Sequence, residues 1–188
     1  MRLFIAINVD RPLKALLAEI QERLKRTAAP VSWVKPENLH FTLKFLGAVP
    51  EDQLPALRAA FRHSLAGIRS FTLLLAGLGA FPPRGKPRVI WVGIEQGTSE
   101  MEKIRERIDE ALLSLGFPRE DRPFRPHLTL GRVRGLRGLD SLVTYLRNAE
   151  VSQVGLMQVR CIELMQSQLH PGGSIYTQVE AVALTEEM

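Results

Sequence analysis

The chain has 188 residues, of which 45% are hydrophobic, and carries 25 Lys and Arg against 20 Asp and Glu, a formal charge of +5. This length and apolar content suffice for a buried core in one domain or in two small lobes. A single cysteine excludes an internal disulfide. The longest apolar run near the N-terminus, residues 3–7, is too short for a signal sequence or a membrane span. We therefore expect a soluble, cytoplasmic protein without membrane contact.

The first part of the chain has the pattern strand, helix, strand, helix, strand. Apolar and β-branched runs predict strands, and apolar residues at helical spacing predict helices. The predicted strands are residues 3–7, 40–43 and 71–75, and the predicted helices are residues 11–25 and 51–63. Residues 81–87 then contain three prolines and a glycine, which excludes a helix or a central strand. We expect this segment to connect two halves.

The second part repeats the same pattern at an offset of about 87 residues. Strands are predicted at 90–94, 127–130 and 155–165, with helices at 98–112 and 138–150. A turn at 171–173 precedes a last extended segment, 175–179. The sequence thus predicts one domain, 1–188, built from two pseudo-repeats at roughly 1–80 and 88–188.

One short motif occurs once in each repeat, as His40-Phe41-Thr42-Leu43 and as His127-Leu128-Thr129-Leu130. In a strand, residues i and i+2 point to the same face, so each histidine lies beside its own threonine. An approximate two-fold axis between the repeats would bring both pairs to one central cleft.

Two histidines that face one reacting centre can act as general base and general acid, because the unperturbed imidazole pKa is about 6.5. Hydrolysis of a phosphodiester needs both, one to activate water and one to protonate the leaving oxygen. Threonine hydroxyls can donate to the phosphate oxygens.

Several other roles for these residue types are less well supported. Neither motif has an Asp, Glu, Cys or second His at ligand spacing, so we expect no metal and no cofactor. His63 and His170 lack a threonine partner and a counterpart at the repeat offset, which favours structural roles.

Arginines crowd around the second motif and would create a positive field for a phosphate-bearing ligand. They are Arg119, Arg122, Arg125, Arg132, Arg134 and Arg137. For each of these arginines, an ordinary solvent-exposed position is about as well supported as a phosphate contact. The same cations also support an alternative function, in which the protein binds RNA ends or nucleotides without catalysis.

The two motifs and their surroundings resemble the 2H phosphoesterase superfamily, and within it the RNA 2′,3′-cyclic phosphodiesterases, also called 2′-5′ RNA ligases. The similar segments are residues 2–6, 33–47, 125–132 and 172–176. The resemblance implies a bilobal α+β fold with two pseudo-symmetric lobes, each an antiparallel sheet with flanking helices, and an active-site cleft between them. It also implies chemistry without a metal.

By the same resemblance, the cyclic phosphate of an RNA 3′ end is opened to a 2′-phosphate. His127 would activate water and His40 would protonate the leaving 3′ oxygen, while Thr42 and Thr129 hold the phosphoryl oxygens. Exchanged histidine roles would give a 3′-phosphate. The family also joins tRNA halves through a 2′-5′ bond, so tRNA fragments, other RNA ends or small nucleotides are candidate partners of a protein expected to be a monomer.

Two further groups of contacts depend on local geometry. Strict strand alternation places Arg132 on the face opposite Thr129, so Arg132 reaches a phosphate only if the strand bends near Gly131. A stacking surface for a base could come from Trp33, Phe45, Phe81 and Tyr176. Each of these rings could instead have an ordinary packing role in the core or at the rim of the cleft. For Phe45, the spacing along the strand favours this packing role.

Overall fold

A computed structural model describes residues 1–120, 123–135, 137–149, 153–171 and 173–186. The strands are β1 (Arg2–Asn8), β2 (Val31–Trp33), β3 (His40–Ala48), β4 (Phe71–Phe81), β5 (Val89–Gln96), β6 (Leu128–Val133), β7 (Gly155–Val159), β8 (Cys161–His170) and β9 (Gly173–Ala183). The α-helices are α1 (Arg11–Lys25), α2 (Leu54–Leu65), α3 (Thr98–Leu113) and α4 (Leu139–Asn148), with short 3₁₀ turns η1 (Pro36–Asn38) and η2 (Glu51–Gln53). Among the described residues, no helix has the length and apolarity needed to cross a membrane.

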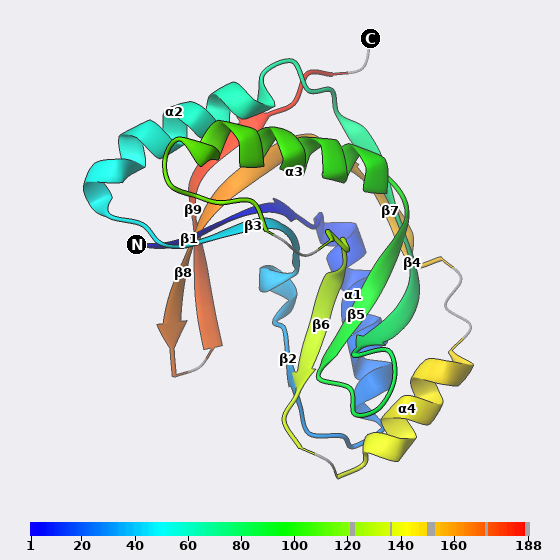
Figure 1. The fold of residues 1–188 in the computed structure, drawn as a ribbon. Coiled ribbons are helices and arrows are strands. Elements are labelled where there is room, and N and C mark those ends of the chain that lie inside the picture. The colour runs from blue at the N-terminus through cyan, green and yellow to red at the C-terminus, as the bar shows by residue number, and fades with distance from the viewer. Residues whose placement is uncertain (121–122, 136, 150–152, 172, 187–188) are drawn as a thin grey trace.

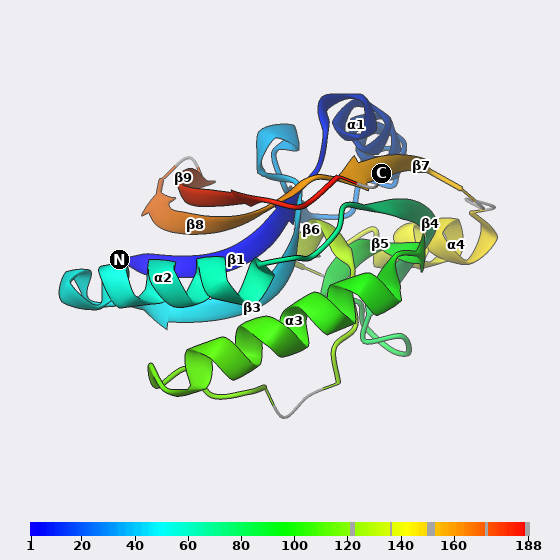
Figure 2. The ribbon, with the colours of Figure 1, turned by 90° about the horizontal axis from the view of Figure 1, so that it is seen from above.

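The strands form one hydrogen-bonded sheet in the order β7-β4-β5-β6-β3-β1-β8-β9, with β2 added to β6. It divides into two lobes, and neighbouring strands are antiparallel throughout. Helices α2 and α3 lie side by side against the lobe of β1 and β3, whereas α1 and α4 cover the lobe of β4, β5 and β6 (Figures 1 and 2). The predicted bilobal α+β fold is confirmed.

The two lobes exchange strands between the two sequence repeats. Strand β4 belongs to the first repeat but pairs with β5 in the second lobe, whereas β8 and β9 come from the second repeat and complete the first lobe beside β1. Each lobe therefore needs both repeats to close its sheet.

The element bounds agree with most of the predicted pattern. Helix α1 begins at the predicted residue because the Asp10 side chain accepts a hydrogen bond from the Leu13 amide, 3.0 Å away. The proline-rich segment forms the hairpin loop between β4 and β5. Glu150, at the end of the predicted helix 138–150, lies outside the described residues, as does Gly172 in the predicted turn.

One predicted element is wrong, and one was missed. Residues 155–165 are two strands, β7 and β8, that separate at Arg160 and pair with different lobes. Both are apolar on their buried side, so apolar periodicity gave no sign of the break. Strand β2 has only three residues, too few for a periodic pattern.

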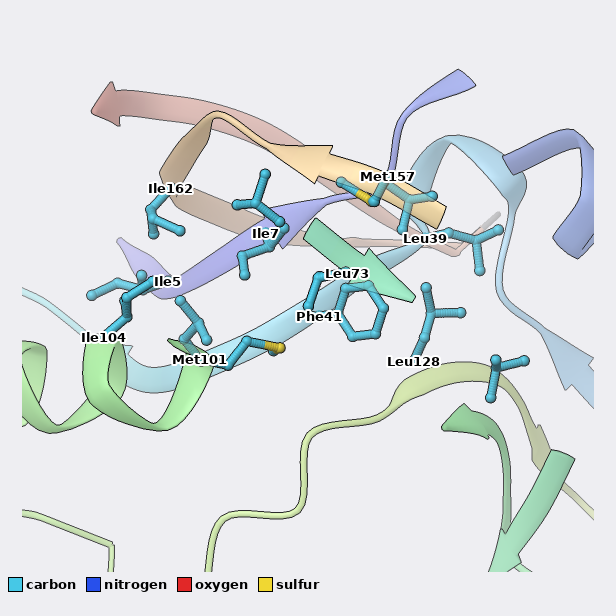
Figure 3. Close-up of a cluster of buried hydrophobic side chains, with 14 of the residues drawn as sticks. Ile5, Ile7, Leu39, Phe41, Leu73, Met101, Ile104, Leu128, Met157 and Ile162 are labelled. Carbon is cyan, nitrogen blue, oxygen red and sulfur yellow. The ribbon is translucent and has the colours of Figure 1, made fainter. Parts of the chain in front are cut away.

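Among the described residues, one pair joins the strands of the two lobes, β3 to β6. Phe41 of β3 pairs with Leu128 of β6, and both side chains are fully buried. Figure 3 shows them in an apolar cluster that includes Ile7 of β1, Leu73 of β4 and Met157 of β7. The central residue of each His-x-Thr motif thus contributes to the core that unites the lobes.

We predict that Phe41→Ala destabilises the protein by about 3–5 kcal/mol, because it leaves a cavity at the junction of the lobes. Phe45→Ala, on the same strand but 66% exposed, should cost below about 1 kcal/mol. Urea unfolding of both variants measures the difference. Equal losses for the two phenylalanines would contradict the assigned role of the junction.

Candidate active site

The pairing of Phe41 with Leu128 places the two motifs on either side of one strand junction. Because side chains alternate along a strand, the flanking histidines and threonines point away from the core. They face a common cleft of about 790 Å³, lined by His40, Thr42, His127 and Thr129. The predicted meeting of both motifs in one cleft is thus observed.

Each imidazole is held in the same way. The Nδ1 atom of His40 lies 2.7 Å from the carbonyl oxygen of Asn38, and that of His127 lies 2.7 Å from the carbonyl oxygen of Arg125. A carbonyl oxygen can only accept, so Nδ1 carries the hydrogen in both rings. The Nε2 atom of each histidine is left for proton transfer.

The two sites differ at Nε2. That atom of His40 lies 3.1 Å from the Thr42 hydroxyl oxygen. In the neutral ring the hydroxyl donates to Nε2, whereas a protonated ring donates to the hydroxyl oxygen and leaves the threonine hydrogen available for another acceptor. Asn38 also fixes this region, because its side-chain amide donates to the Ser174 carbonyl oxygen of β9 at 2.8 Å.

An aromatic ring packs edge-on against each imidazole. Tyr176 lies 5.3 Å from His40 with an interplanar angle of 86°, and Phe81 lies 5.0 Å from His127 at 84°. Phe4 adds a second ring, 5.0 Å from His40. These contacts restrict the orientation of both histidines, and the rings of Phe81 and Tyr176 also line the cleft.

A β-bulge follows the second motif and brings Arg132 into the site. Thr129 pairs with Trp91 and Gly131 pairs with the preceding residue of β5, so Leu130 has no partner there. The extra residue reverses the alternation: Leu130 and Gly131 are both buried, and Arg132 is exposed and lines the cleft. This is the bend that a phosphate contact by Arg132 requires.

The first motif is followed by an equivalent bulge. Thr42 pairs with Ala6 and Lys44 pairs with Ile5, which leaves Leu43 without a partner, at the repeat offset from Leu130. Phe45 consequently lies at the cleft, in the position that corresponds to Arg132. Its exposure excludes a core role, and it offers an aromatic face to a ligand.

Trp33 is not among the described residues that line the cleft. It pairs with Gly131 and packs against the main core. A Cβ atom at Gly131 would lie 2.5 Å from Val31 Cγ1 and 3.0 Å from Trp33 Cε3, so β2 fits closely over the bulge only because a glycine is there. Trp33 supports the bulge rather than a bound base.

A buried ionic cluster holds the segment that leads into His127. Lys44 forms an ion pair with Asp109 of α3 and donates to the Pro118 carbonyl oxygen at 2.7 Å. Arg105 lies 3.6 Å from the same carboxylate and stacks its guanidinium 4.9 Å above the Phe124 ring, which lines the cleft. The sequence patterns did not identify this cluster, because strict alternation places Lys44 on the cleft face with His40 and Thr42.

The pKa of His40 lies below the ordinary histidine value of 6.5. Desolvation is the main cause, the hydrogen bond to Asn38 opposes it, and the charge of Lys14 lowers the pKa further. The Lys14 ammonium is fixed by donation to the Glu37 carbonyl oxygen at 3.1 Å. In the free protein, the neutral form of His40 is therefore favoured near pH 7.

The other predicted residues lie in varied places. Arg125 lines the cleft, Arg119 pairs with Glu110, Arg134 donates to the Ser32 hydroxyl at 2.8 Å, and Arg137 is exposed. Arg122 lies outside the described residues.

His63 and His170 are exposed on α2 and β8, and neither lines the cleft. In the described part of the chain, no group of three or more His, Cys, Asp or Glu could hold a metal ion.

Comparison with known families agrees with this geometry. The sequence matches the family described as LigT like Phosphoesterase over residues 7–91 and again over residues 92–176. The chain belongs to this family. The two matched segments follow the internal duplication, and each contains one His-x-Thr motif.

Relatives of this LigT-like phosphoesterase cover its full length. The RNA 2′,3′-cyclic phosphodiesterase of Methanothermobacter thermautotrophicus is 38% identical over 184 residues, which span 98% of this chain and 99% of that protein. A Thermus thermophilus protein of known crystal structure superposes with a TM-score of 0.78 at 31% identity, with 100% of both chains covered. The crystal structure of E. coli LigT complexed with 3′-AMP gives a TM-score of 0.79 at 25% identity over 98% of each chain.

We predict that the His40 imidazole titrates with a midpoint below 6.5 in nuclear magnetic resonance spectra of the free protein. Lys14→Met should raise this midpoint, because a nearby positive charge disfavours the imidazolium ion. Lys25→Met is the matched control, since Lys25 is on the same helix but pairs with Glu22 at 2.6 Å. A midpoint at or above 6.5 in the unmodified protein would contradict the claim that burial lowers the pKa of His40.

Proposed function

We propose that this LigT-like phosphoesterase hydrolyses the 2′,3′-cyclic phosphate at the 3′ end of RNA to a 2′-phosphate. The observation that carries the proposal is the common cleft that His40 and His127 face, each with Nδ1 fixed on a carbonyl oxygen. The activity in the name of the Methanothermobacter relative, which matches 98% of this chain, agrees with it.

In this mechanism His127 is the general base. Its Nε2 atom takes a proton from water as the water oxygen attacks phosphorus. The bond from phosphorus to the 3′ oxygen breaks on the opposite side, and Nε2 of His40 gives its proton to that oxygen. The products are a 2′-phosphate and a 3′-hydroxyl, and proton exchange with solvent restores both histidines.

The lowered pKa of His40 suits a proton donor once the substrate is bound. In the free protein the neutral ring is favoured, but the negative charge of a phosphodiester raises the pKa of a nearby imidazole. When His40 is protonated, its Nε2 no longer accepts from Thr42, so the threonine hydroxyl hydrogen can be donated to a phosphate oxygen.

The remaining polar groups of the cleft would bind the non-bridging oxygens. Thr42 and Thr129 supply hydroxyl donors from the two lobes, and Arg132 supplies a guanidinium. Phe45, Phe81 and Tyr176 provide rings against which the terminal base can stack. The cleft volume lies in the range of sites that hold small ligands such as a nucleotide.

The same site permits related outcomes. If the histidines exchange roles, the 2′ oxygen leaves and the product is a 3′-phosphate. If the 5′-hydroxyl of a second RNA replaces water, a 2′-5′ bond forms, which is the ligation expected from the family resemblance. We treat hydrolysis of RNA ends, including tRNA fragments, by a cytoplasmic monomer as the principal activity.

Two alternatives have specific support. Small nucleotides are candidate substrates because the E. coli relative is seen with 3′-AMP. A binding module without turnover is supported only by the cations of the cleft, and binding alone has no need for two matched Nε2 atoms.

We predict that His40→Ala and His127→Ala each lower kcat by roughly 10²- to 10⁴-fold on a dinucleotide with a 2′,3′-cyclic phosphate. The double variant should lose little more than either single one, because the two groups act as a unit. His63→Ala, at an exposed position on α2, is the control and should keep full activity. Turnover by either single variant at the unmodified rate would refute the mechanism.

We further predict that hydrolysis continues in excess chelator, because proton transfer by two imidazoles supplies both steps. Phosphorus magnetic resonance of the product identifies the phosphate position. A 2′-phosphate supports the assigned roles, and a 3′-phosphate supports the exchanged ones. Loss of activity in chelator that returns on adding a divalent ion would overturn the metal-free mechanism.

A further inference from the structure

Three segments of this protein, 27–36, 77–94 and 122–139, carry basic residues and no acidic residue. They carry nine of the 25 basic residues: Lys35, Arg84, Lys86, Arg88, Arg122, Arg125, Arg132, Arg134 and Arg137. The rest of the chain then holds 16 basic residues against 20 acidic ones and is net negative. The excess of +5 therefore arises entirely from these segments.

The fold brings the three segments together at one end of the second lobe. Strand β6 pairs with β2 on one side and with β5 on the other. The Val133 amide donates to the Arg88 carbonyl oxygen at 2.9 Å, and the Arg134 amide donates to the Pro30 carbonyl oxygen at 2.7 Å. The backbone of Arg88 thus lies beside Val133, between Arg132 of β6 and Arg134, which follows that strand.

These cations are accessible and have no acidic partner in the part of the chain that the structure describes. Arg84, Lys86, Arg88, Arg132 and Arg134 are all exposed. None of them forms an ion pair with the described residues, although surface arginines elsewhere do, as Arg58 and Arg62 do with Glu180. A net positive surface without internal counter-charges favours a polyanionic partner.

The cationic surface is continuous with the active-site cleft. Arg132 lines the cleft, and the ring of Phe81, which contacts His127, directly precedes the β4–β5 loop. Arg84 follows Phe81 by three residues, so its Cα lies within about 11 Å of the Phe81 Cα. A polynucleotide whose terminal phosphate is in the cleft can therefore reach the loop cations.

We propose that Arg84, Lys86, Arg88 and Arg134 bind the sugar-phosphate backbone of RNA on the 5′ side of the cyclic phosphate. This backbone track rests on the proposed function and specifies its substrate as a polynucleotide end rather than a mononucleotide. The contacts go to phosphates, so they favour chain length and not base sequence.

The test compares kcat/KM for two RNAs that end in a 2′,3′-cyclic phosphate, one of about two and one of about 12 nucleotides, between about 50 and 200 mM salt. The 12-mer should be the better substrate by about tenfold or more at low salt. The triple variant Arg84→Gln, Lys86→Gln, Arg88→Gln should remove most of that advantage. For the 12-mer, the slope of log kcat/KM against log salt concentration should become less steep by up to about 2. The kcat/KM for the dinucleotide should change less than twofold.

A matched control removes three charges at the other end of β4. Arg69 and Lys103 line a separate hollow there, and Arg160 follows the residue that pairs with Phe71. All three are exposed, and Arg69→Gln, Lys103→Gln, Arg160→Gln should leave both substrates within twofold of the unmodified protein. Equal losses in the two triple variants would show a net-charge effect and overturn the track.

Equal kcat/KM for the two RNAs with the unmodified protein would also overturn the track while leaving the proposed function intact. If neither RNA is hydrolysed, the proposed function fails. Fluorescence anisotropy of the labelled longer RNA then tests the track separately. Weaker binding by the loop variant than by the control variant supports it, and equal binding refutes it.

Discussion

The antiparallel pairing of Phe41 with Leu128 is the contact on which the other features of this protein depend. It joins the two lobes of the sheet, it lies at the centre of the buried core, and it fixes the separation of the two His-x-Thr motifs. Because side chains alternate across a strand, burying these two residues obliges their neighbours to face the cleft. The same pair therefore provides both stability and the geometry of the site.

The exchange of strands links the two repeats into one fold. Strand β4 closes the second lobe, and β8 and β9 close the first, so neither repeat can complete its sheet alone. The rings that orient the histidines come from these exchanged strands: Tyr176 from β9 contacts His40, and Phe81 from β4 contacts His127. Duplication thus gives two similar half-sites, each supported by the other half of the chain.

Small departures from symmetry give the half-sites different properties. The paired bulges present Phe45 at one side of the cleft and Arg132 at the other, an aromatic ring opposite a cation. Lys44, after the first bulge, is buried against Asp109 and holds the segment before His127, whereas the equivalent residue after the second bulge is Gly131. In the proposed function, Phe45 would stack on a base and Arg132 would bind a phosphate oxygen.

The sequence by itself determined the repeated elements, the pairing of each histidine with a threonine and the family, because strand and helix periods and the motifs are local properties. The tertiary structure decided which strands complete which lobe, since β7 and β8 are separated in the sequence by Arg160 alone and yet pair in different lobes. It also decided that Arg132 and Phe45 reach the cleft, because a bulge depends on the register of neighbouring strands. The sequence could not predict the buried cluster around Lys44, because the partners of Lys44 are 65 and 74 residues away along the chain.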